Sequence, residues 1–259
     1  MTSDANSAPS PKGAAANEWV EIIKTIVYAL LIALVLRVLL FQPFTIPSAS
    51  MEPNLFEGDY IIVSKYSYGY SRHSTPISLP PSMSGRLFGH EPTRGDIIVF
   101  KLPRDNKTDY IKRLIGLPGD RIQVKQSVVY INDKPVIRKR MPDGTEDMGY
   151  GVSKTVQRYQ ETLPNGVSFL TNSYGNDGDV DNTDVFVVPE GHYFMMGDNR
   201  DNSLDSRFPE EVGVGFVPGE NLEGRAQIVL LSWKAGASIL KPWTWVMNVR
   251  PSRFFHMLR

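Results

Sequence analysis

Two serines stand two positions apart after Pro47, and either could act as a nucleophile. Ser48 and Ser50 are separated by the small residue Ala49. A serine hydroxyl becomes an effective nucleophile only when a neighbouring base removes its proton. Serines are also common in ordinary turns. The segment therefore predicts catalysis only if the chain supplies a base elsewhere.

Histidine, the usual base for such a serine, gives no supporting pattern. The four histidines stand at positions 73, 90, 192 and 256, and no two have the spacing of a helical metal site. No Ser-His-Asp arrangement is visible, and a structural role is favoured for His192. The chain has no cysteine, which excludes disulfides, Cys-ligated zinc and thiol nucleophiles.

Lysine is the other base known to serve a serine, and Lys112 has an unusual setting. In a strand, Tyr110, Lys112 and Leu114 share one face, which is apolar apart from the lysine. Burial would lower the pKa of this amine, and a base must be neutral. The pattern also fits a lysine that reaches solvent from a strand edge, and taken alone it favours that structural role.

A third segment, Met195 to Arg207, is rich in Gly, Asp and Asn. This composition is typical of a rigid loop held by bonds from side chains to the backbone. Asp201, Ser203 and Asp205 alternate as the ligands of a calcium loop do. Two arginines intervene and no glutamate closes the set, so no metal site is predicted.

A hydrophobic stretch precedes these three segments in the chain. Residues 22–41 form an apolar run of twenty residues with two charges, long enough at ~1.5 Å per residue to cross a bilayer. They predict a single transmembrane helix after a disordered tail, residues 1–21. Lys12 lies before the run and Lys24 near its N-terminal end, whereas the chain after Arg37 is free of Lys and Arg up to Lys65. This asymmetry favours a cytoplasmic N-terminus and a body outside the cytoplasm.

The stretch admits two other interpretations. It could be a buried core helix, or a cleavable signal peptide in which residues 48–50 imitate a small-residue cleavage site. The long apolar run and the long polar tail before it disfavour cleavage. From Phe41 the chain reaches Ser50 in nine residues, at most ~30 Å, so a nucleophile there would lie near the membrane.

The remainder of the chain predicts a mostly β protein. Short β-branched runs bounded by turn residues predict strands at Tyr60–Ser64, Asp96–Lys101, Tyr110–Ile115, Arg121–Val124, Val128–Ile131, Val185–Val188, His192–Met196 and Ala226–Trp233. The tripeptide at 131–133 predicts a hairpin turn. The expected architecture is one N-terminal transmembrane helix followed by an all-β catalytic body with an inserted, less regular β segment.

The expected boundaries follow from shifts in composition. Residues 42–126 and 189–235 would form the two parts of the catalytic core, and residues 127–188 the insert. Residues 236–259 form a C-terminal tail that mixes Trp, Phe and Arg. That mixture suits a membrane interface, and equally a tail packed on the body.

In this order, four blocks of the sequence resemble bacterial type I signal peptidases, also called leader peptidases. The blocks are residues 46–53, 94–100, 110–120 and 197–207. The resemblance implies a serine endopeptidase with a Ser–Lys dyad, in which Ser50 is the nucleophile and Lys112 the general base. It implies no metal and no cofactor. Ala49 stands where the family often has glycine, and little consequence is expected.

The resemblance also assigns supporting roles. The hydroxyl of Ser48 would assist the backbone N–H of Ser50 in an oxyanion hole, and Ser203 would hydrogen-bond and orient the lysine. Ion pairs are implied between Asp205 and Arg207 and between Asp198 and Arg113. The walls of the substrate pockets would be Phe44, Ile46, Pro47, Met51, Leu55, Ile61, Val99, Tyr110 and Ile111.

The implied substrates are exported preproteins that carry small residues at −3 and −1 of the cleavage site. The lipid bilayer is the second expected partner. Twenty-eight basic and 28 acidic residues cancel, which gives no basis for nucleic-acid binding. A monomer in the bacterial inner membrane is expected, and proximity to the export translocon is left open.

Two rival functions share parts of this pattern. A self-cleaving repressor with a Ser–Lys dyad would need a helix-turn-helix domain and a soluble N-terminus, and the sequence has neither. A non-enzymatic, membrane-anchored envelope scaffold or binding protein would use the same strands structurally, and Ser50→Ala would leave its function intact.

Overall fold

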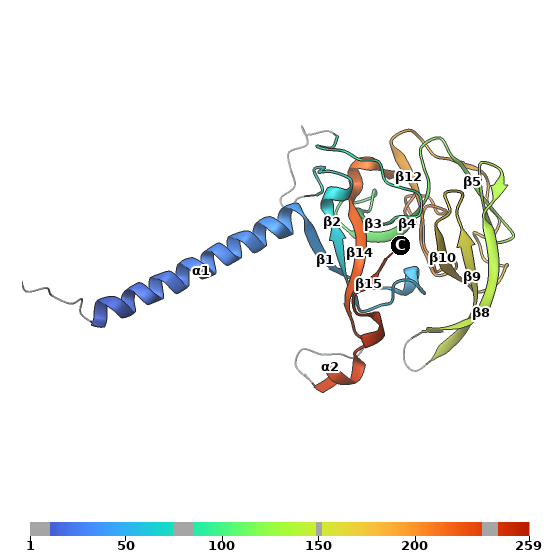
Figure 1. Cartoon of the computed structure of the whole chain (residues 1–259). Coiled ribbons are helices and arrows are strands. Elements are labelled where there is room, and N and C mark those ends of the chain that lie inside the picture. The colour runs from blue at the N-terminus through green and yellow to red at the C-terminus, as the bar shows by residue number, and fades with distance from the viewer. Residues whose placement is uncertain (1–10, 75–84, 149–151, 235–242, 259) are drawn as a thin grey trace, which may run out of the picture. The chain divides into compact units, whose positions relative to one another are not determined.

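The computed structural model describes residues 11–74, 85–148, 152–234 and 243–258 (Figure 1). The chain divides into two compact units, residues 1–40 and 41–259. The predicted class is confirmed: one long apolar helix near the N-terminus, followed by antiparallel sheets.

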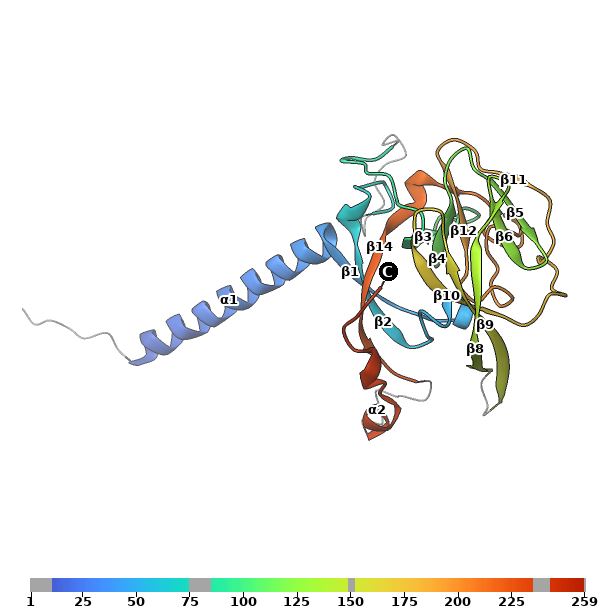
Figure 2. The same ribbon diagram turned by 45° about the vertical axis from the view of Figure 1, so that its right-hand side comes forward.

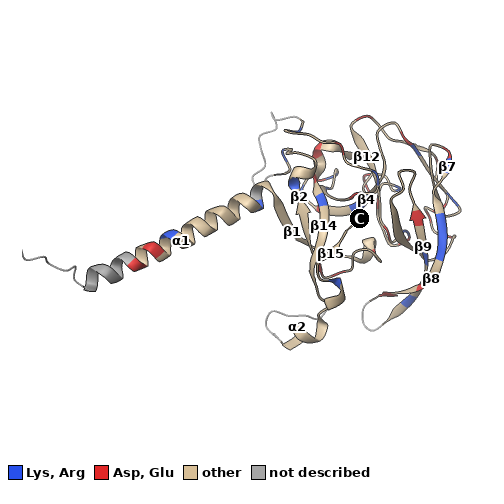
Figure 3. Cartoon of the chain, in the orientation of Figure 1, with Lys and Arg blue, Asp and Glu red and all other residues tan. Residues whose placement is uncertain are grey.

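The first unit contains helix α1, Pro11–Leu39. Its stretch Glu18–Arg37 is long and apolar enough to cross a membrane, and no charge lies between Lys24 and Arg37 (Figure 3). The helix begins upstream of the expected span because Pro11 suits a first helical position and three alanines follow it. It ends just before Phe41, which already belongs to a strand. Residues 1–10 of the expected tail lie outside the described residues.

The second unit is built around an eight-stranded antiparallel sheet. In chain order its strands are β1 (Phe41–Thr45), β2 (Asp59–Ser64), β3 (Ile97–Lys101), β4 (Asp109–Gly116), β12 (His192–Met196), β13 (Val217–Pro218), β14 (Leu222–Ser232) and β15 (His256–Met257). Their order in space is β1-β2-β14-β3-β4-β12-β13, and β15 pairs with β14. The sheet thus joins strands that lie far apart in the sequence.

Two smaller sheets lie beside it (Figure 2). One has the order β10-β9-β8, the other β11-β5-β6-β7. Their strands are β5 (Arg121–Lys125), β6 (Val128–Ile131), β7 (Lys134–Pro135), β8 (Ile137–Asp147), β9 (Ser153–Thr162), β10 (Ser168–Ser173) and β11 (Phe186–Val187). The remaining elements are helix α2 (Trp243–Asn248) and 3-10 turns at Ala49–Met51, Lys65–Ser67, Gly219–Asn221 and Pro251–Arg253.

The predicted strands are all present within a few residues of their expected ends. The hairpin turn is confirmed, because Asn132 and Asp133 have φ of 53° and 64°, as a type I′ turn requires. The segment expected to be less regular contains β8–β10, a regular sheet of three strands. Its strands are mostly polar, with few apolar residues to mark the period of two.

Three hydrophobic clusters hold the sheets together. One packs Ile46, Met51 and Leu55 against β2, β3 and β14. A second includes residues of β3, β4 and β12, and a third joins β4 and β12 to the smaller sheets. The central strands β3 and β4 are buried along most of their length. A charged residue in β4 is therefore enclosed by protein.

The described part of the C-terminal tail packs on this unit. Arg253 forms a bidentate ion pair with the buried Asp59, and Leu258 belongs to the first cluster. Ahead of it, α2 leaves Trp243, Val246 and Met247 mostly exposed. Both expectations for the tail thus have a basis in the structure, packing in one part and apolar exposure in the other.

Candidate active site

The nucleophile candidate lies in a short turn that the core fixes at both ends. Ile46 exchanges backbone hydrogen bonds with the chain at Gly58 and Asp59, and its side chain is buried. The 3-10 turn Ala49–Met51 follows, with Met51 fully buried. Ser50 is only 9% exposed, and its hydroxyl accepts a hydrogen bond of 2.7 Å from Lys112 Nζ. The structure thus brings together two residues 62 positions apart.

Lys112 lies in the middle of β4, paired across the sheet with Ile98 of β3. Its side chain is 4% exposed, so the interpretation as a lysine at a strand edge is wrong. Burial lowers the pKa of Lys112 from 10.5 to about 8. Asp205 and Asp198 raise this pKa and Arg207 lowers it, but the loss of hydration outweighs them. The amine is therefore much closer to neutral at pH 7 than an exposed lysine.

Ser48 is exposed, and its Oγ lies 3.3 Å from Ser50 Oγ. Ser203 lines the same cleft, but its buried Oγ has no hydrogen-bond partner in the described part of the chain. The loop places this hydroxyl against Gly197. The expected hydrogen bond from Ser203 to Lys112 is thus absent from the structure, and an orienting role for Ser203 stays a prediction.

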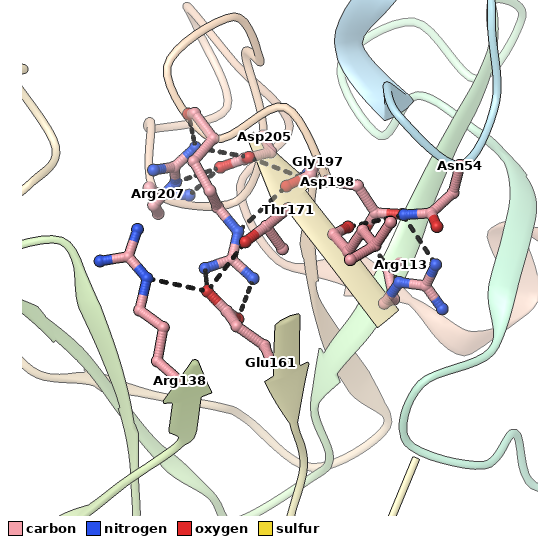
Figure 4. A network of polar contacts seen from close by, with 11 residues as sticks. Asn54, Arg113, Arg138, Glu161, Thr171, Gly197, Asp198, Asp205 and Arg207 are labelled. Atoms are coloured by element: carbon pink, nitrogen blue, oxygen red, sulfur yellow. Dashed lines mark hydrogen bonds and ion pairs between the residues drawn. The ribbon is translucent and has the colours of Figure 1, made fainter. Parts of the chain in front are cut away.

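Both expected ion pairs are present (Figure 4). The guanidinium of Arg113 donates two hydrogen bonds of 2.7 Å to Asp198, and both side chains are 1% exposed. Arg207 donates two, of 2.8 and 2.9 Å, to Asp205. Asp205 also accepts from the backbone N–H of Gly197. The two pairs tie the loop after β12 to β4 and to its own backbone beside the lysine.

A second set of contacts, which no sequence pattern indicates, joins this loop to the sheet β8–β10. Arg200 donates two hydrogen bonds, of 2.8 and 2.5 Å, to the buried Glu161 of β9. Asn172 of β10 exchanges backbone hydrogen bonds with Asp198 and Arg200. Glu146 of β8 accepts hydrogen bonds from the side chains of Asn199 and Asn202. The insert is therefore a direct support of the loop.

A cleft of about 490 Å³ opens above the serine and the lysine. Its lining comes from both sides of the dyad: Pro47, Ser48, Ser50, Thr108, Asp109, Tyr110, Ile111, Lys112, Asp201, Asn202, Ser203, Leu204 and Phe208.

Three of the expected pocket residues, Pro47, Tyr110 and Ile111, are among those lining residues. The others belong to the adjoining hydrophobic cluster, which also contains Ile111; they are Phe44, Ile46, Met51, Leu55, Ile61 and Val99. Five of these six are buried, and Phe44 is partly buried. In the structure they lie behind the cleft wall, and their role as pocket walls stays a prediction. Spacing in the sequence does not distinguish a wall from the packing behind it.

A serine hydroxyl bound by a desolvated lysine amine beside an open cleft can perform acyl transfer without a metal. The sequence profile of the family "Signal peptidase, peptidase S26" matches residues 19–233. The chain belongs to this family. It is a serine endopeptidase of the signal peptidase I class, as the sequence predicted.

Named relatives agree over nearly the whole chain. Signal peptidase I of Rickettsia canadensis is 42% identical over 259 residues, covering 94% of this chain and 93% of the relative. That of Rickettsia massiliae is 42% identical, covering 98% and 97%. That of Rickettsia typhi is 44% identical, covering 89% and 90%. The matched region includes both parts of the sheet and the insert.

Proposed function

We propose that Ser50 attacks the scissile carbonyl while Lys112 removes its proton. The hydrogen bond of 2.7 Å between the two buried side chains carries this proposal. A lysine with its ordinary pKa is neutral in only ~0.04% of molecules at pH 7. With a pKa of about 8, roughly a tenth would be neutral. The lowered pKa thus supports Lys112 as a base.

The bonds change in two balanced steps. Ser50 Oγ bonds to the carbonyl carbon, the C–N bond breaks, and the proton on Lys112 passes to the leaving amine. A water molecule then gives its proton to Lys112 and attacks the ester. The ester bond breaks, and the same proton returns to Ser50 Oγ. The lysine is neutral again at the end of each cycle.

The oxyanion formed in both steps needs donors. We assign this role to the backbone N–H of Ser50 and the hydroxyl of Ser48. The proximity of the two hydroxyls, 3.3 Å, and the place of Ser48 in the cleft support the assignment. Loss of one such donor costs about 10²–10³ in kcat in other serine hydrolases.

The substrates proposed are signal-peptide preproteins with small residues at −3 and −1. The named relatives are signal peptidases, and the cleft has apolar walls at Pro47, Tyr110 and Ile111 that would exclude larger side chains. Because both side chains of the dyad are buried, the site favours an extended segment with small side chains over a folded one.

The proposed location is the bacterial inner membrane, with the N-terminus cytoplasmic and the β unit outside. The apolar helix and the lysines before and within it support this orientation. The exposed side chains of Trp243, Val246 and Met247 suit a catalytic unit that works at a lipid interface. A monomer suffices for this chemistry, because all the residues assigned to it come from one chain.

Cleavage of a preprotein with an Ala-x-Ala site, in detergent or lipid, tests the proposal. Wild type should cut after the −1 alanine, and S50A and K112A should be inactive. The surface variants S168A and K139A serve as matched controls and should cleave normally. Full activity of K112A would mean that another group is the base. A folded but inactive wild type would favour the anchored-scaffold function.

A further inference from the structure

The direction of the Ser50 N–H is set by the carbonyl before it. Ala49 C=O and Ser50 N–H belong to one planar trans peptide, so they point in opposite directions. Ala49 O accepts hydrogen bonds from Asn199 Nδ2 at 3.2 Å and from Glu52 N at 3.0 Å. Ser50 O accepts from the backbone N–H of Asn199 at 3.1 Å. One asparagine therefore holds the carbonyls on both sides of the nucleophile.

The amide of Asn199 is held in turn by Glu146. Of the two hydrogens on Asn199 Nδ2, one is donated to Ala49 O and the other to Glu146 Oε1 at 2.9 Å. Asn199 Oδ1 is buried and has no hydrogen-bond partner within the described ranges. If the amide were turned by 180°, its oxygen would face two acceptors, Ala49 O and Glu146 Oε1. Glu146 therefore favours the orientation in which the NH2 group faces them.

Glu146 is itself fixed in place. It is 1% exposed in β8, and its two oxygens also accept hydrogen bonds from Asn202 at 2.7 Å and from the hydroxyl of Tyr174 at 2.9 Å. A buried carboxylate with three donors has a defined position. The chain of contacts thus runs from the insert sheet through one side chain to the peptide of the nucleophile.

We propose that Glu146 is a positioning residue for catalysis: acting through Asn199, it aims the Ser50 N–H at the oxyanion. The inference rests on the proposed function, which assigns that N–H to the oxyanion hole. It gives the insert a role in the reaction, because β8 supplies the residue that orients the donor. Glu146 touches neither the substrate nor the reacting atoms.

The test compares full-length variants in a steady-state cleavage assay. E146A should lower kcat about tenfold and change KM by less than about twofold, since a misaimed donor is lost mainly in the transition state. E146Q keeps an acceptor for the amide of Asn199 and should stay within about threefold of wild type. T145A, an exposed position of the same strand, is the matched control and should be unchanged.

Double-mutant cycles test whether Glu146 acts through Asn199. If Glu146 acts through Asn199, E146A should lower kcat by less than about twofold in a chain that already carries N199A. N199D has the same size but presents an acceptor to Glu146, and should lower kcat at least about tenfold. Adding E146Q to N199D should restore part of that loss. This pair keeps the test decisive if E146A does not fold.

If Glu146 had a purely structural role, E146A would weaken the binding of a transition-state analogue and of a substrate-like peptide equally. A peptide aldehyde ending in Ala-x-Ala forms a tetrahedral adduct with a serine and so probes the oxyanion hole. In E146A its affinity should fall by the same factor as kcat/KM, and that of an uncleavable peptide of the same sequence should be unchanged. Equal losses for both ligands, or multiplicative effects of E146A and N199A, would overturn the proposal. Activity in S50A would instead refute the proposed function itself.

Discussion

Replacing Lys112 by methionine should abolish cleavage and at the same time stabilise the protein below pH 8. The substitution keeps the volume of the side chain but removes its charge. Lys112 is 4% exposed and lies in the central strand β4, so its protonated amine is desolvated in the folded state. In the unfolded chain the same amine is hydrated.

The lowered pKa gives the size of the effect. The pKa falls from 10.5 to about 8, and each unit corresponds to about 1.4 kcal/mol. Below pH 8 the lysine is protonated in both states, and its burial costs about 3 kcal/mol of folding free energy. The hydrogen bond to Ser50 returns about 1 kcal/mol of this. K112M should therefore be more stable by about 2 kcal/mol at pH 6, or about 4–8 °C in Tm.

The stability difference between K112M and wild type should change with pH in a definite direction. Between pH 8 and 10.5 the unfolded wild type binds more protons than the folded one, so its stability rises with pH. The advantage of K112M should shrink above pH 8 by up to about 1.4 kcal/mol per unit. Thermal unfolding in detergent at pH 6, 7, 8 and 9 measures both quantities. S50A keeps the buried amine and is the control with wild-type pH dependence. An advantage that is absent at pH 6, or constant across the range, would refute the reasoning.

Three other substitutions test the surroundings of the dyad. D198N leaves the buried guanidinium of Arg113 without its carboxylate and should lower stability by about 3–5 kcal/mol, measured by thermal melting; a change below about 1 kcal/mol would contradict the assigned pair. S203A removes a hydroxyl that has no hydrogen-bond partner among the residues the structure describes, and should melt within about 2 °C of wild type. A larger drop would reveal a partner for that hydroxyl in solution. G197A places a methyl 2.6 Å from Ser50 O and should lower kcat by about 10–100-fold; normal turnover would show that this contact can relax.

The strands were predictable where burial imposes a pattern. Residues 97–101 and 110–115 are rich in β-branched side chains because β3 and β4 pack in the core. The sheet β8–β10 was not predictable from the sequence, because most of its side chains are polar. Within it, Glu146 and Glu161 look like solvated charges in the sequence, and only the tertiary structure buries them.

The residues of the site were predictable from four sequence blocks that resemble a known family, but the geometry of the site was not. Nothing local brings Ser50 to Lys112, because the contact needs the non-local pairing of β2, β14, β3 and β4. Taken alone, the pattern around Lys112 favoured a solvent-exposed amine, which the burial of β4 on both faces rules out. The support of the loop by the insert depends on hydrogen bonds between residues 39 and 53 positions apart, which the sequence pattern does not record.

The pH dependence of kcat/KM tests the central claim, a neutral Lys112 acting on Ser50, most directly. The substrate should be a peptide with an Ala-x-Ala site and no group that titrates between pH 6 and 9. The lowered pKa of Lys112 predicts that kcat/KM rises about tenfold per unit below pH 8 and levels off above it. A profile that is flat from pH 6 to 9, or one with its midpoint near the ordinary histidine value of about 6.5, would contradict a lysine base.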